Sequence, residues 1–392
     1  MAGDGPAILA GRLDAASRRS VWYLKRRLWL SRPFSRNARH RLLILSVDER
    51  IPQSQVHPFH LYSRPAADRF GTEIREIPVT RYLSADHPGL RDAGTVCFQT
   101  QFSISPGELA ELLATIRTRN PGARLVYLDW FAPTDLRVAE RLDPHVDLYV
   151  KKHILADRAL YGGETLGDTN LTDYYSRRFG IDLPPTRFAI PAGFLDKLIL
   201  GPSFATAQFL QPALRRPTPP PPAPRPIDLH ARIAIGGTSW YQAMRGESAE
   251  AVSNLHGVTT AAGAGVGLIR YLRELRHSKI CFSPFGYGEV CWRDYEAVAN
   301  GAVLLKPDMS HIRTDPDIFR PHETYVPLRW DLDDFEETVT ALLRDEPLRA
   351  RIARQAFAVL HDYLASDRFV DQMRAVLAPP GQALPQPAGR SS

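Results

Sequence analysis

The sequence predicts an α/β protein with two domains built on parallel sheets, and three observations lead to that prediction. Short apolar runs typical of buried strands alternate with amphipathic helical segments over most of the chain. The alternation stops at a proline-rich stretch and then starts again. The 392 residues suffice for two domains of ordinary size. Strands separated by helices favour parallel sheets that are covered on both faces.

The first alternating segment spans residues 42–214 and is interpreted as an N-terminal domain. Its expected strands are residues 42–47, 96–100, 125–130 and 146–151, and its expected helices are residues 106–118 and 134–141. Residues 152–214 show no clear period and are rich in Tyr, Gly and Pro, so we expect surface loops there.

The second alternating segment spans residues 227–377 and follows a proline-rich linker at 215–226. The linker contains RRPTPPPPAPR, which predicts a stiff polyproline II connector, with a plain surface loop as the alternative. The expected strands are residues 227–235, 279–283, 302–306 and 324–328, and the expected helices are residues 239–251, 267–276, 290–300 and 333–344, with one or two long helices in 348–377. Residues 378–392 are expected to be a disordered tail.

Positive charge is concentrated at the N-terminus. Residues 1–41 contain ten Arg or Lys and two Asp, a net charge of +8, whereas the rest of the chain carries −2. A nearly neutral body argues against a nucleic-acid partner. Within this basic arm, residues 12–41 interleave Trp, Tyr and Leu with Arg and Lys, which favours an interfacial helix on an anionic membrane surface. A helix packed on the protein itself is the alternative.

Cysteine usage and targeting signals indicate the compartment. The three cysteines form no CxxC motif, which fits a reducing environment. No apolar run reaches the roughly 20 residues that span a bilayer, and the N-terminal residues lack the charge pattern of a signal peptide. We therefore expect a cytoplasmic protein, peripheral on the inner face of the cell membrane if the arm is interfacial.

The most informative stretch is residues 278–307, SKICFSPFGYGEVCWRDYEAVANGAVLLKP, a strand, a glycine-rich turn, a helix and a strand. Ligands of open α/β sheets bind beyond the carboxyl ends of strands, where this turn lies. Gly286 and Gly288 are expected to allow close backbone approach and positive φ, and the next helix to aim free N–H groups at a phosphate. Arg293 and Glu296 share a helix face and suit a diphosphate and a ribose diol. An exposed ion pair is the alternative.

A second glycine turn opens the second segment. In residues 227–245, IDLHARIAIGGTSWYQAMR, an alternating strand precedes Gly236 and Gly237, and Thr238 or Ser239 is expected to cap the following helix. A strand, a Gly–Gly turn and a helix form a weak phosphate-binding motif. Arg245 lies nearly two turns into the helix and is expected to reach the same site. A plain turn between strand and helix is the alternative.

The first segment offers candidate acid–base residues at the carboxyl ends of its strands. Asp129 ends the expected strand 125–130 beside two aromatic residues, where a sugar ring would stack and a carboxylate would accept a hydroxyl proton. A structural role in a turn or helix cap is the alternative. Four further candidates follow the first strand, the two histidines in an expected loop: Asp48, Glu49, His57 and His60.

Residues 278–303 resemble the donor-site signature of GT-B glycosyltransferases, in particular the exostosin-like and CgeB-like branches. The matching residues are Ser278, Lys279, Pro284, Gly286, Gly288, Arg293, Glu296, Ala297, Gly301, Ala302 and Val303. The resemblance implies two facing Rossmann-like domains with parallel sheets and a nucleotide-diphospho-sugar donor bound by the second. It also implies that Glu296 binds the ribose, that Arg293 lies near the diphosphate, and that the 236–238 turn contacts the diphosphate.

The sequence departs from this pattern at one carboxylate. Retaining enzymes of family 4 carry two Glu eight positions apart, whereas Glu289 and Glu296 are seven apart, and Glu289 lies in the turn. Glu289 stays a catalytic candidate, but the pattern leaves both inversion and retention of the anomeric configuration open.

Missing motifs exclude several other enzyme classes. The chain has no GxxxxGK[ST], no HExxH, no clustered Cys/His metal site and no GxSxG elbow. We expect no metal and no cofactor besides the donor substrate. The resemblance implies transfer of a sugar to a glycan or lipid-linked glycan acceptor, in bacterial cell-surface polysaccharide synthesis. A non-catalytic GT-B-like scaffold that binds a nucleotide or a glycan is the alternative.

Overall fold

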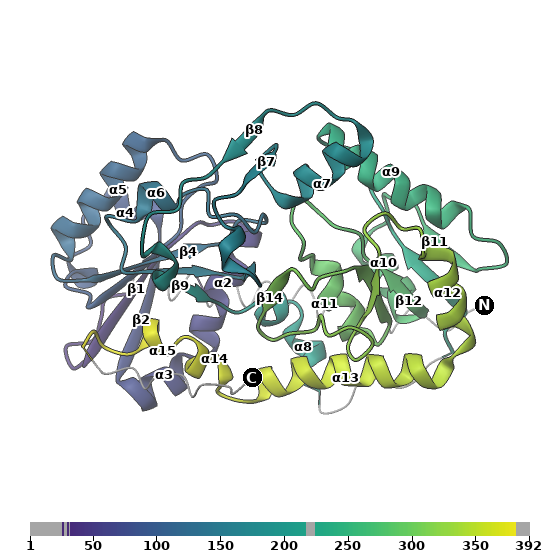
Figure 1. Ribbon diagram of the computed structural model, residues 1–392. Coiled ribbons are helices and arrows are strands. Elements are labelled where there is room, and N and C mark those ends of the chain that lie inside the picture. Colours follow the sequence, from purple (N-terminus) through teal and green to yellow (C-terminus); the bar gives the residue numbers. More distant parts are fainter. Residues whose placement is uncertain (1–25, 27–29, 31, 217–223, 382–392) are drawn as a thin grey trace. The chain divides into compact units, whose positions relative to one another are not determined.

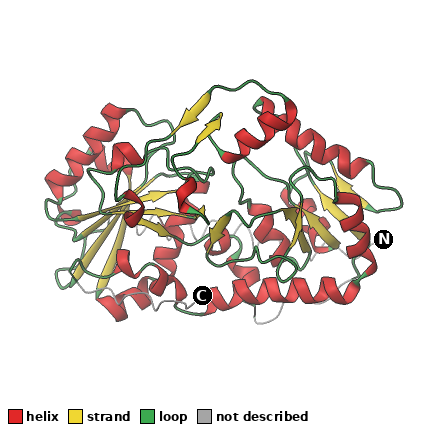
Figure 2. Ribbon diagram, in the orientation of Figure 1, coloured by secondary structure: helices red, strands yellow, loops and turns green. Residues whose placement is uncertain are grey.

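A computed structural model describes residues 26, 30, 32–216 and 224–381 of the chain (Figure 1). Helices surround the strands of two separate sheets, and strands pair in parallel within both of them (Figure 2). The predicted α/β fold class, with Rossmann-like parallel sheets, is therefore confirmed.

The first sheet has the strand order β2-β1-β3-β4-β5-β9. Its strands are β1 (His40–Ser46), β2 (Thr72–Pro78), β3 (Thr95–Phe98), β4 (Arg124–Asp129), β5 (Leu148–Lys151) and β9 (Leu198–Leu200). Strand β1 pairs in parallel with β2 and β3, and β5 with β9. The central strands are mostly apolar and buried because helices cover both faces; the four residues of β3, for example, are all buried. The four strands expected in this segment are confirmed, with bounds shifted by up to two residues.

The helices of this segment are α2 (Arg50–Leu61), α3 (Ser63–Phe70), α4 (Val79–Ser84), α5 (Pro106–Arg119), α6 (Ala139–Leu142) and α7 (Asn170–Phe179). Of these, α5 and α6 overlap expected helices, and the other four were not expected. The expected loop location of His57 and His60 is wrong, because both lie on α2. Residues 152–214, expected to be loops, contain α7 and also the short helix α8 (Gln211–Leu214).

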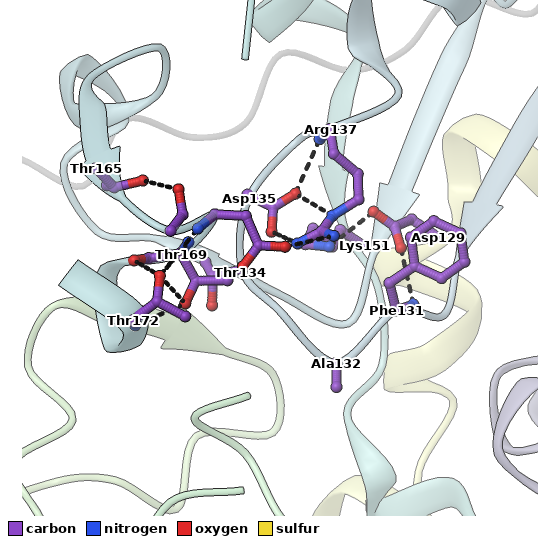
Figure 3. Close-up of polar contacts among 12 residues, drawn as sticks. Asp129, Phe131, Ala132, Thr134, Asp135, Arg137, Lys151, Thr165, Thr169 and Thr172 are labelled. Atoms are coloured by element: carbon purple, nitrogen blue, oxygen red, sulfur yellow. Dashed lines mark hydrogen bonds and ion pairs between the residues drawn. The ribbon is translucent and has the colours of Figure 1, made fainter. Parts of the chain in front are cut away.

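The helix expected at residues 134–141 is mostly a turn. The Asp135 carboxylate accepts a hydrogen bond from the Arg137 N–H at 3.0 Å, and the Arg137 guanidinium bonds to Asp135 and Asp168 (Figure 3). These local side-chain bonds compete with helical hydrogen bonds, so that only the four-residue α6 forms.

The second sheet has the strand order β11-β10-β12-β13-β15. Its strands are β10 (Ile227–Ala231), β11 (Thr260–Ala262), β12 (Ser278–Phe282), β13 (Val303–Pro307) and β15 (Val326–Leu328). Strand β10 pairs in parallel with β11 and β12, and β13 with β12 and β15. Around the sheet lie α9 (Ser239–Ser253), α10 (Leu268–Arg276), α11 (Trp292–Ala299), α12 (Phe335–Arg344) and α13 (Glu346–Ala365). Apolar residues of the strands pack against α12 and α13 in one core. The expected helical region 348–377 is divided into α13, α14 (Arg368–Gln372) and α15 (Arg374–Leu377).

The chain forms two compact units. Unit 1 comprises residues 1–49, 59–126 and 374–392, and unit 2 comprises residues 50–58 and 127–373. Unit 2 therefore contains the whole second sheet together with the chain that follows β4. Within unit 2, a short antiparallel pair joins β6 (His153–Leu155) to β14 (Ile312–Thr314). The two units do not coincide with the expected domains, and the boundaries of those domains stay a prediction.

Most of the basic arm, the centre of the proline linker and the end of the tail lie outside the described residues. Arg26, which belongs to the arm, is described and is buried in unit 1. Its guanidinium donates to Glu76 at 3.0 Å and pairs with Asp48. At this residue the arm is packed on the protein itself. Among the described residues, none of the helices has the length and apolar character that crossing a bilayer requires.

Glu76 depends on the partners that surround it in unit 1. It is 1% exposed and accepts hydrogen bonds from Arg26, from the Ser46 hydroxyl at 2.6 Å and from the His60 ring at 2.7 Å. Burial would raise the pKa of Glu76, but His60, Arg26 and Ser46 outweigh it and hold the pKa well below its usual range. The carboxylate is therefore charged in the folded protein and needs compensation.

Arg26→Ala is expected to lower the free energy of unfolding by about 3–5 kcal/mol, because it leaves a buried charge without its cation. Urea denaturation measures this change. Arg36→Ala, at an exposed arginine nearby in the sequence, is the control and should change stability by less than about 0.5 kcal/mol. Equal effects of the two substitutions would mean that the arm contributes nothing specific at Arg26.

Candidate functional site

An exposed glycine turn follows the first strand of the second sheet. Strand β10 ends at Ala231, residues 234–239 are all exposed, and α9 begins at Ser239. Gly236 and Gly237 have φ of 156° and 113°, and Gly237 in particular has a conformation that side chains disfavour. Thr238 is the N-cap residue as expected, but its side chain makes no capping hydrogen bond. The N–H groups at the start of this 15-residue helix thus follow an exposed turn, and the end of a helix with free N–H groups favours an anion.

Arg245 is an arginine buried without an acidic partner. It lies on α9, is 8% exposed and donates from Nη2 to the Tyr241 hydroxyl at 2.7 Å. Its Nε and Nη1 have no hydrogen-bond partner, and it forms no ion pair with any described residue. Burial of a cation without a compensating anion is unfavourable. Arg245 is therefore a buried cation whose charge no described carboxylate balances.

The glycine-rich turn after β12 packs against the chain's own backbone. An ideal Cβ on Gly288 would lie 2.0 Å from the Ala132 carbonyl oxygen, so that only glycine fits there. A Cβ on Gly286 would lie 3.3 Å from the Cys291 sulfur. The expected positive φ is wrong for both residues, since neither has one. The close backbone approach expected at this turn is real, but at Gly288 the approaching group is Ala132.

The start of α11 is already occupied by a carboxylate of the same helix. The Cys291 N–H donates to Asp294 at 2.8 Å, and the Ser283 hydroxyl donates to the same carboxylate at 2.6 Å. The Lys306 ammonium lies 3.3 Å from Asp294, and both side chains are fully buried. Asp294 thus caps the helix and places a negative charge at its start, while the prediction that this helix directs free N–H groups at a phosphate stays a prediction.

Arg293 and Glu296 lie on α11 as predicted, but they form no ion pair within 4.0 Å in the described structure. Arg293 is partly buried and donates from Nη2 to the Arg232 carbonyl at 2.5 Å. Glu296 is 9% exposed and accepts a hydrogen bond from the Tyr271 hydroxyl at 2.9 Å through Oε2. Burial raises the pKa of Glu296, while Tyr271 and the Arg293 and Arg50 charges oppose the rise. The alternative of an exposed ion pair is not realised, and Oε1 stays available to a ligand hydroxyl.

Asp129 is buried and fully bonded at the end of β4. Its Oδ1 accepts the Phe131 N–H at 2.9 Å, and its Oδ2 accepts the Tyr149 hydroxyl at 2.6 Å and the Lys151 ammonium at 2.7 Å (Figure 3). The side chain is 1% exposed. A carboxylate in this state has no oxygen free to accept a proton from a sugar hydroxyl. The geometry therefore favours the structural alternative over the base role that the sequence predicted.

Glu289 is also enclosed, by side chains that the β6–β14 pair brings together. Its Oε2 accepts the Thr134 hydroxyl at 2.6 Å, and the rings of His153 and His311 lie 3.8 and 3.7 Å from its oxygens. Burial would raise the pKa of Glu289, but His311, His153 and Thr134 outweigh it and lower the pKa to about 2. Glu289 is fully buried and ionised at neutral pH. Its position is that of a structural anion, whereas the sequence predicted catalysis.

The remaining acid–base candidates have other partners. Asp48 pairs with Arg26, Glu49 accepts a hydrogen bond from Gln101 at 3.0 Å, and His60 bonds to Glu76. His57 is buried on α2. None of them is thereby identified as a base. No group of three or more acidic, His or Cys side chains among the described residues could hold a metal ion.

Two tyrosines of the site were not predicted. Tyr241 on α9 and Tyr287 in the turn between Gly286 and Gly288 stack with ring centroids 4.4 Å apart and planes 3° apart. Tyr287 is 46% exposed. The spacing of the two tyrosines along the chain does not predict that they stack. The position of Tyr287 between two glycines of a predicted site turn could, however, have marked it as a candidate contact.

Comparisons with known proteins agree with the sequence prediction. Residues 222–375 match the family model described as glycosyl transferase-like. This match confirms the glycosyltransferase resemblance, which the sequence placed at residues 278–303. No curated protein is a significant sequence match.

Several solved structures resemble the chain at low identity. An alpha-glucosyltransferase in complex with UDP is 9% identical with a TM-score of 0.49, covering 86% of this chain and 99% of that one. An alpha-glucosyltransferase with UDP-glucose and DNA containing an abasic site is 9% identical with a TM-score of 0.48 and the same coverage. TarM is 8% identical with a TM-score of 0.43, covering 72% of this chain and 54% of that one.

The Glu289 cluster predicts a pH dependence of stability through His153. Burial lowers the pKa of His153 to about 4, and its Nε2–H donates to the Ala132 carbonyl at 3.1 Å. Because the unfolded chain takes up this proton near pH 6.5, His153 should reduce the free energy of unfolding as the pH falls from 6.5 towards 4, by roughly 2–4 kcal/mol. Urea denaturation of wild type and His153→Gln measures this contribution.

The His153→Gln variant should lose less stability than wild type over that pH range. His256→Gln, at an exposed histidine of unit 2, is the control and should keep the wild-type pH profile. Parallel profiles for all three proteins would show that His153 is not neutral and buried in the folded state.

Proposed function

We propose that the chain is a glycosyltransferase that uses a nucleotide-diphospho-sugar donor. The observation that carries this proposal is Arg245, a buried cation without an acidic partner among the described residues. Arg245 lies on α9, the helix that follows the exposed 236–238 turn. A diphosphate supplies the missing anion, and the match of residues 222–375 to the glycosyl transferase-like family supports a nucleotide-sugar as its source.

The proposed donor site extends from the start of α9 to α11. Gly236, Gly237, Thr238 and Arg245 would hold the diphosphate, since helix N-termini and guanidinium groups both favour phosphate oxygens. Gly286 and Gly288 shape the neighbouring turn. Arg293 would lie near the diphosphate, and Glu296 would accept hydrogen bonds from the ribose diol through Oε1.

The proposed reaction is transfer of the sugar to an acceptor hydroxyl. The acceptor oxygen bonds to the anomeric carbon, the bond from that carbon to the diphosphate oxygen breaks, and the hydroxyl proton passes to a base. The leaving diphosphate gains negative charge, which the α9 N–H groups and Arg245 would stabilise more strongly than in the ground state. Asp129 and Glu289 are not assigned as the base because both are enclosed.

The finer parts of the proposal rest on the family resemblance. We infer a glycan or lipid-linked glycan acceptor, a role in bacterial cell-surface polysaccharide synthesis, and a cytoplasmic protein that meets anionic membrane through residues 12–41. We expect no nucleic-acid acceptor, since the chain apart from its basic arm carries −2. A non-catalytic scaffold is the second candidate, and the enclosed state of Asp129 and Glu289 is the observation that favours it.

Two measurements test the proposal. A panel of nucleotide-sugars and nucleoside diphosphates should raise the thermal unfolding temperature, since saturation at 100 times Kd adds roughly 2.7 kcal/mol. Incubation with the stabilising nucleotide-sugar and glycan acceptors should release nucleoside diphosphate. Stabilisation without turnover would favour the scaffold, and the absence of both would reject the donor site.

Arg245→Met is expected to weaken nucleoside diphosphate binding by about 10- to 150-fold, since hydrogen bonds to a charged group contribute roughly 1.5–3 kcal/mol. The substitution also removes an uncompensated buried charge, so the unliganded protein should be as stable as wild type or more stable. Calorimetry and thermal unfolding measure the two effects. Arg351→Met, at an exposed arginine of α13, should change neither. A destabilised Arg245→Met would indicate a structural arginine.

Glu296→Ala is expected to weaken binding of a nucleoside diphosphate by about 10- to 150-fold. It should leave binding of inorganic diphosphate unchanged, because the proposed contact is to the ribose. Calorimetric titration with both ligands separates the two cases. Equal losses for both ligands would mean that Glu296 acts on the diphosphate region and not on the ribose.

A further inference from the structure

Tyr287 lies inside the proposed diphosphate site. The Thr238 N–H, at the start of α9, donates to the Tyr287 hydroxyl at 3.3 Å. An ideal Cβ on Gly237 would lie 2.2 Å from the same hydroxyl oxygen. The phenol oxygen is therefore held directly against the glycine turn, where a phosphate oxygen would otherwise be bound.

The second anion-binding group of the site is also bonded to a tyrosine hydroxyl. Arg245 donates to the Tyr241 hydroxyl at 2.7 Å, and its guanidinium lies 5.0 Å from the centre of the Tyr241 ring. Tyr241 in turn stacks on Tyr287. In the unliganded protein, the helix N-terminus and the buried arginine thus each donate one hydrogen bond to an uncharged tyrosine oxygen.

We propose that Tyr287 is a displaceable cover of this site, whose hydroxyl takes the place of a diphosphate oxygen until the ligand arrives. This inference rests on the proposed function. One N–H cannot donate well to two oxygens at once, so that the diphosphate and the Tyr287 hydroxyl compete for Thr238. Tyr287 is then a positioning residue that tunes affinity for the diphosphate and not for the nucleoside.

The surroundings of Tyr287 allow the side chain to leave while the turn stays in place. Its ring is 46% exposed, and the hydrogen bond to Thr238 is long for an N–H donor. The backbone on its C-terminal side is fixed, because Gly288 lies against the Ala132 carbonyl. Displacement is therefore a side-chain rotation, which breaks one weak hydrogen bond, the stack on Tyr241 and the edge contact with Trp240.

Tyr287→Phe tests this inference, because it keeps the ring and removes only the competing oxygen. Calorimetry with UDP, GDP, ADP and inorganic diphosphate should give about 2- to 10-fold tighter Kd for the probes that wild type binds. Uridine, guanosine and adenosine should show no gain, since they carry no diphosphate. Tyr174→Phe, which removes a tyrosine hydroxyl elsewhere in unit 2, is the matched control and should bind as wild type does.

Hydrogen exchange gives a readout that needs no ligand. The Thr238 amide should exchange faster in Tyr287→Phe than in wild type, because its acceptor is gone. Unchanged exchange, or Kd values for the diphosphate probes that are equal to or weaker than those of wild type, would overturn the displaceable cover. Failure of every probe to bind either protein would instead reject the proposed function, and the cover with it.

Discussion

The turn between β12 and α11 is fixed by a contact between two backbones, and the rest of the site depends on it. Gly288 lies so close to the Ala132 carbonyl that a Cβ would be 2.0 Å away. The two chain neighbours of Gly288 have opposite environments: Tyr287 is half exposed, whereas Glu289 is fully buried. The same carbonyl accepts the His153 ring N–H, which places that histidine near Glu289. One close approach therefore sets both the outer and the inner side of the turn.

The distribution of buried charge indicates where an external ligand is needed. Three buried carboxylates have a cation within hydrogen-bonding or ion-pair distance, namely Glu76 with Arg26, Asp129 with Lys151 and Asp294 with Lys306. Such pairs offset the cost of burial within the chain itself. Arg245 is buried without a counter-ion among the described residues. An uncompensated buried charge destabilises the unliganded protein, and this is the observation that supports the proposed anionic ligand.

Sequence patterns predicted the elements that have strong periodicity and missed those that do not. Most strands of the two sheets were found because their apolar runs are short and bounded by turns, but β2, β9 and β11 were missed. The helix α2 was also missed, because its polar, proline-containing sequence, RIPQSQVHPFHL, has no clear apolar period. The site glycines were recognised from their spacing. Their physical roles were not, because Ala132 is 156 residues from Gly288 and the Tyr241–Tyr287 stack forms only in the folded chain.

Two helix N-termini follow a strand and a glycine turn in the second sheet, and their caps differ in a way that decides their use. At α11 the cap is the Asp294 carboxylate, which Ser283 and Lys306 hold in place. This negative charge repels a phosphate. If Asp294 moved away, the buried Lys306 ammonium would lose its carboxylate partner. At α9 the Thr238 N–H is bonded, among the described residues, to the Tyr287 hydroxyl, which is uncharged, half exposed and weakly bonded. An uncharged cap on an exposed ring is easier for an anion to replace than a buried, paired carboxylate. The glycine-rich stretch that first suggested phosphate binding thus contributes in a different way: it carries the tyrosine that covers the proposed phosphate site at the other helix.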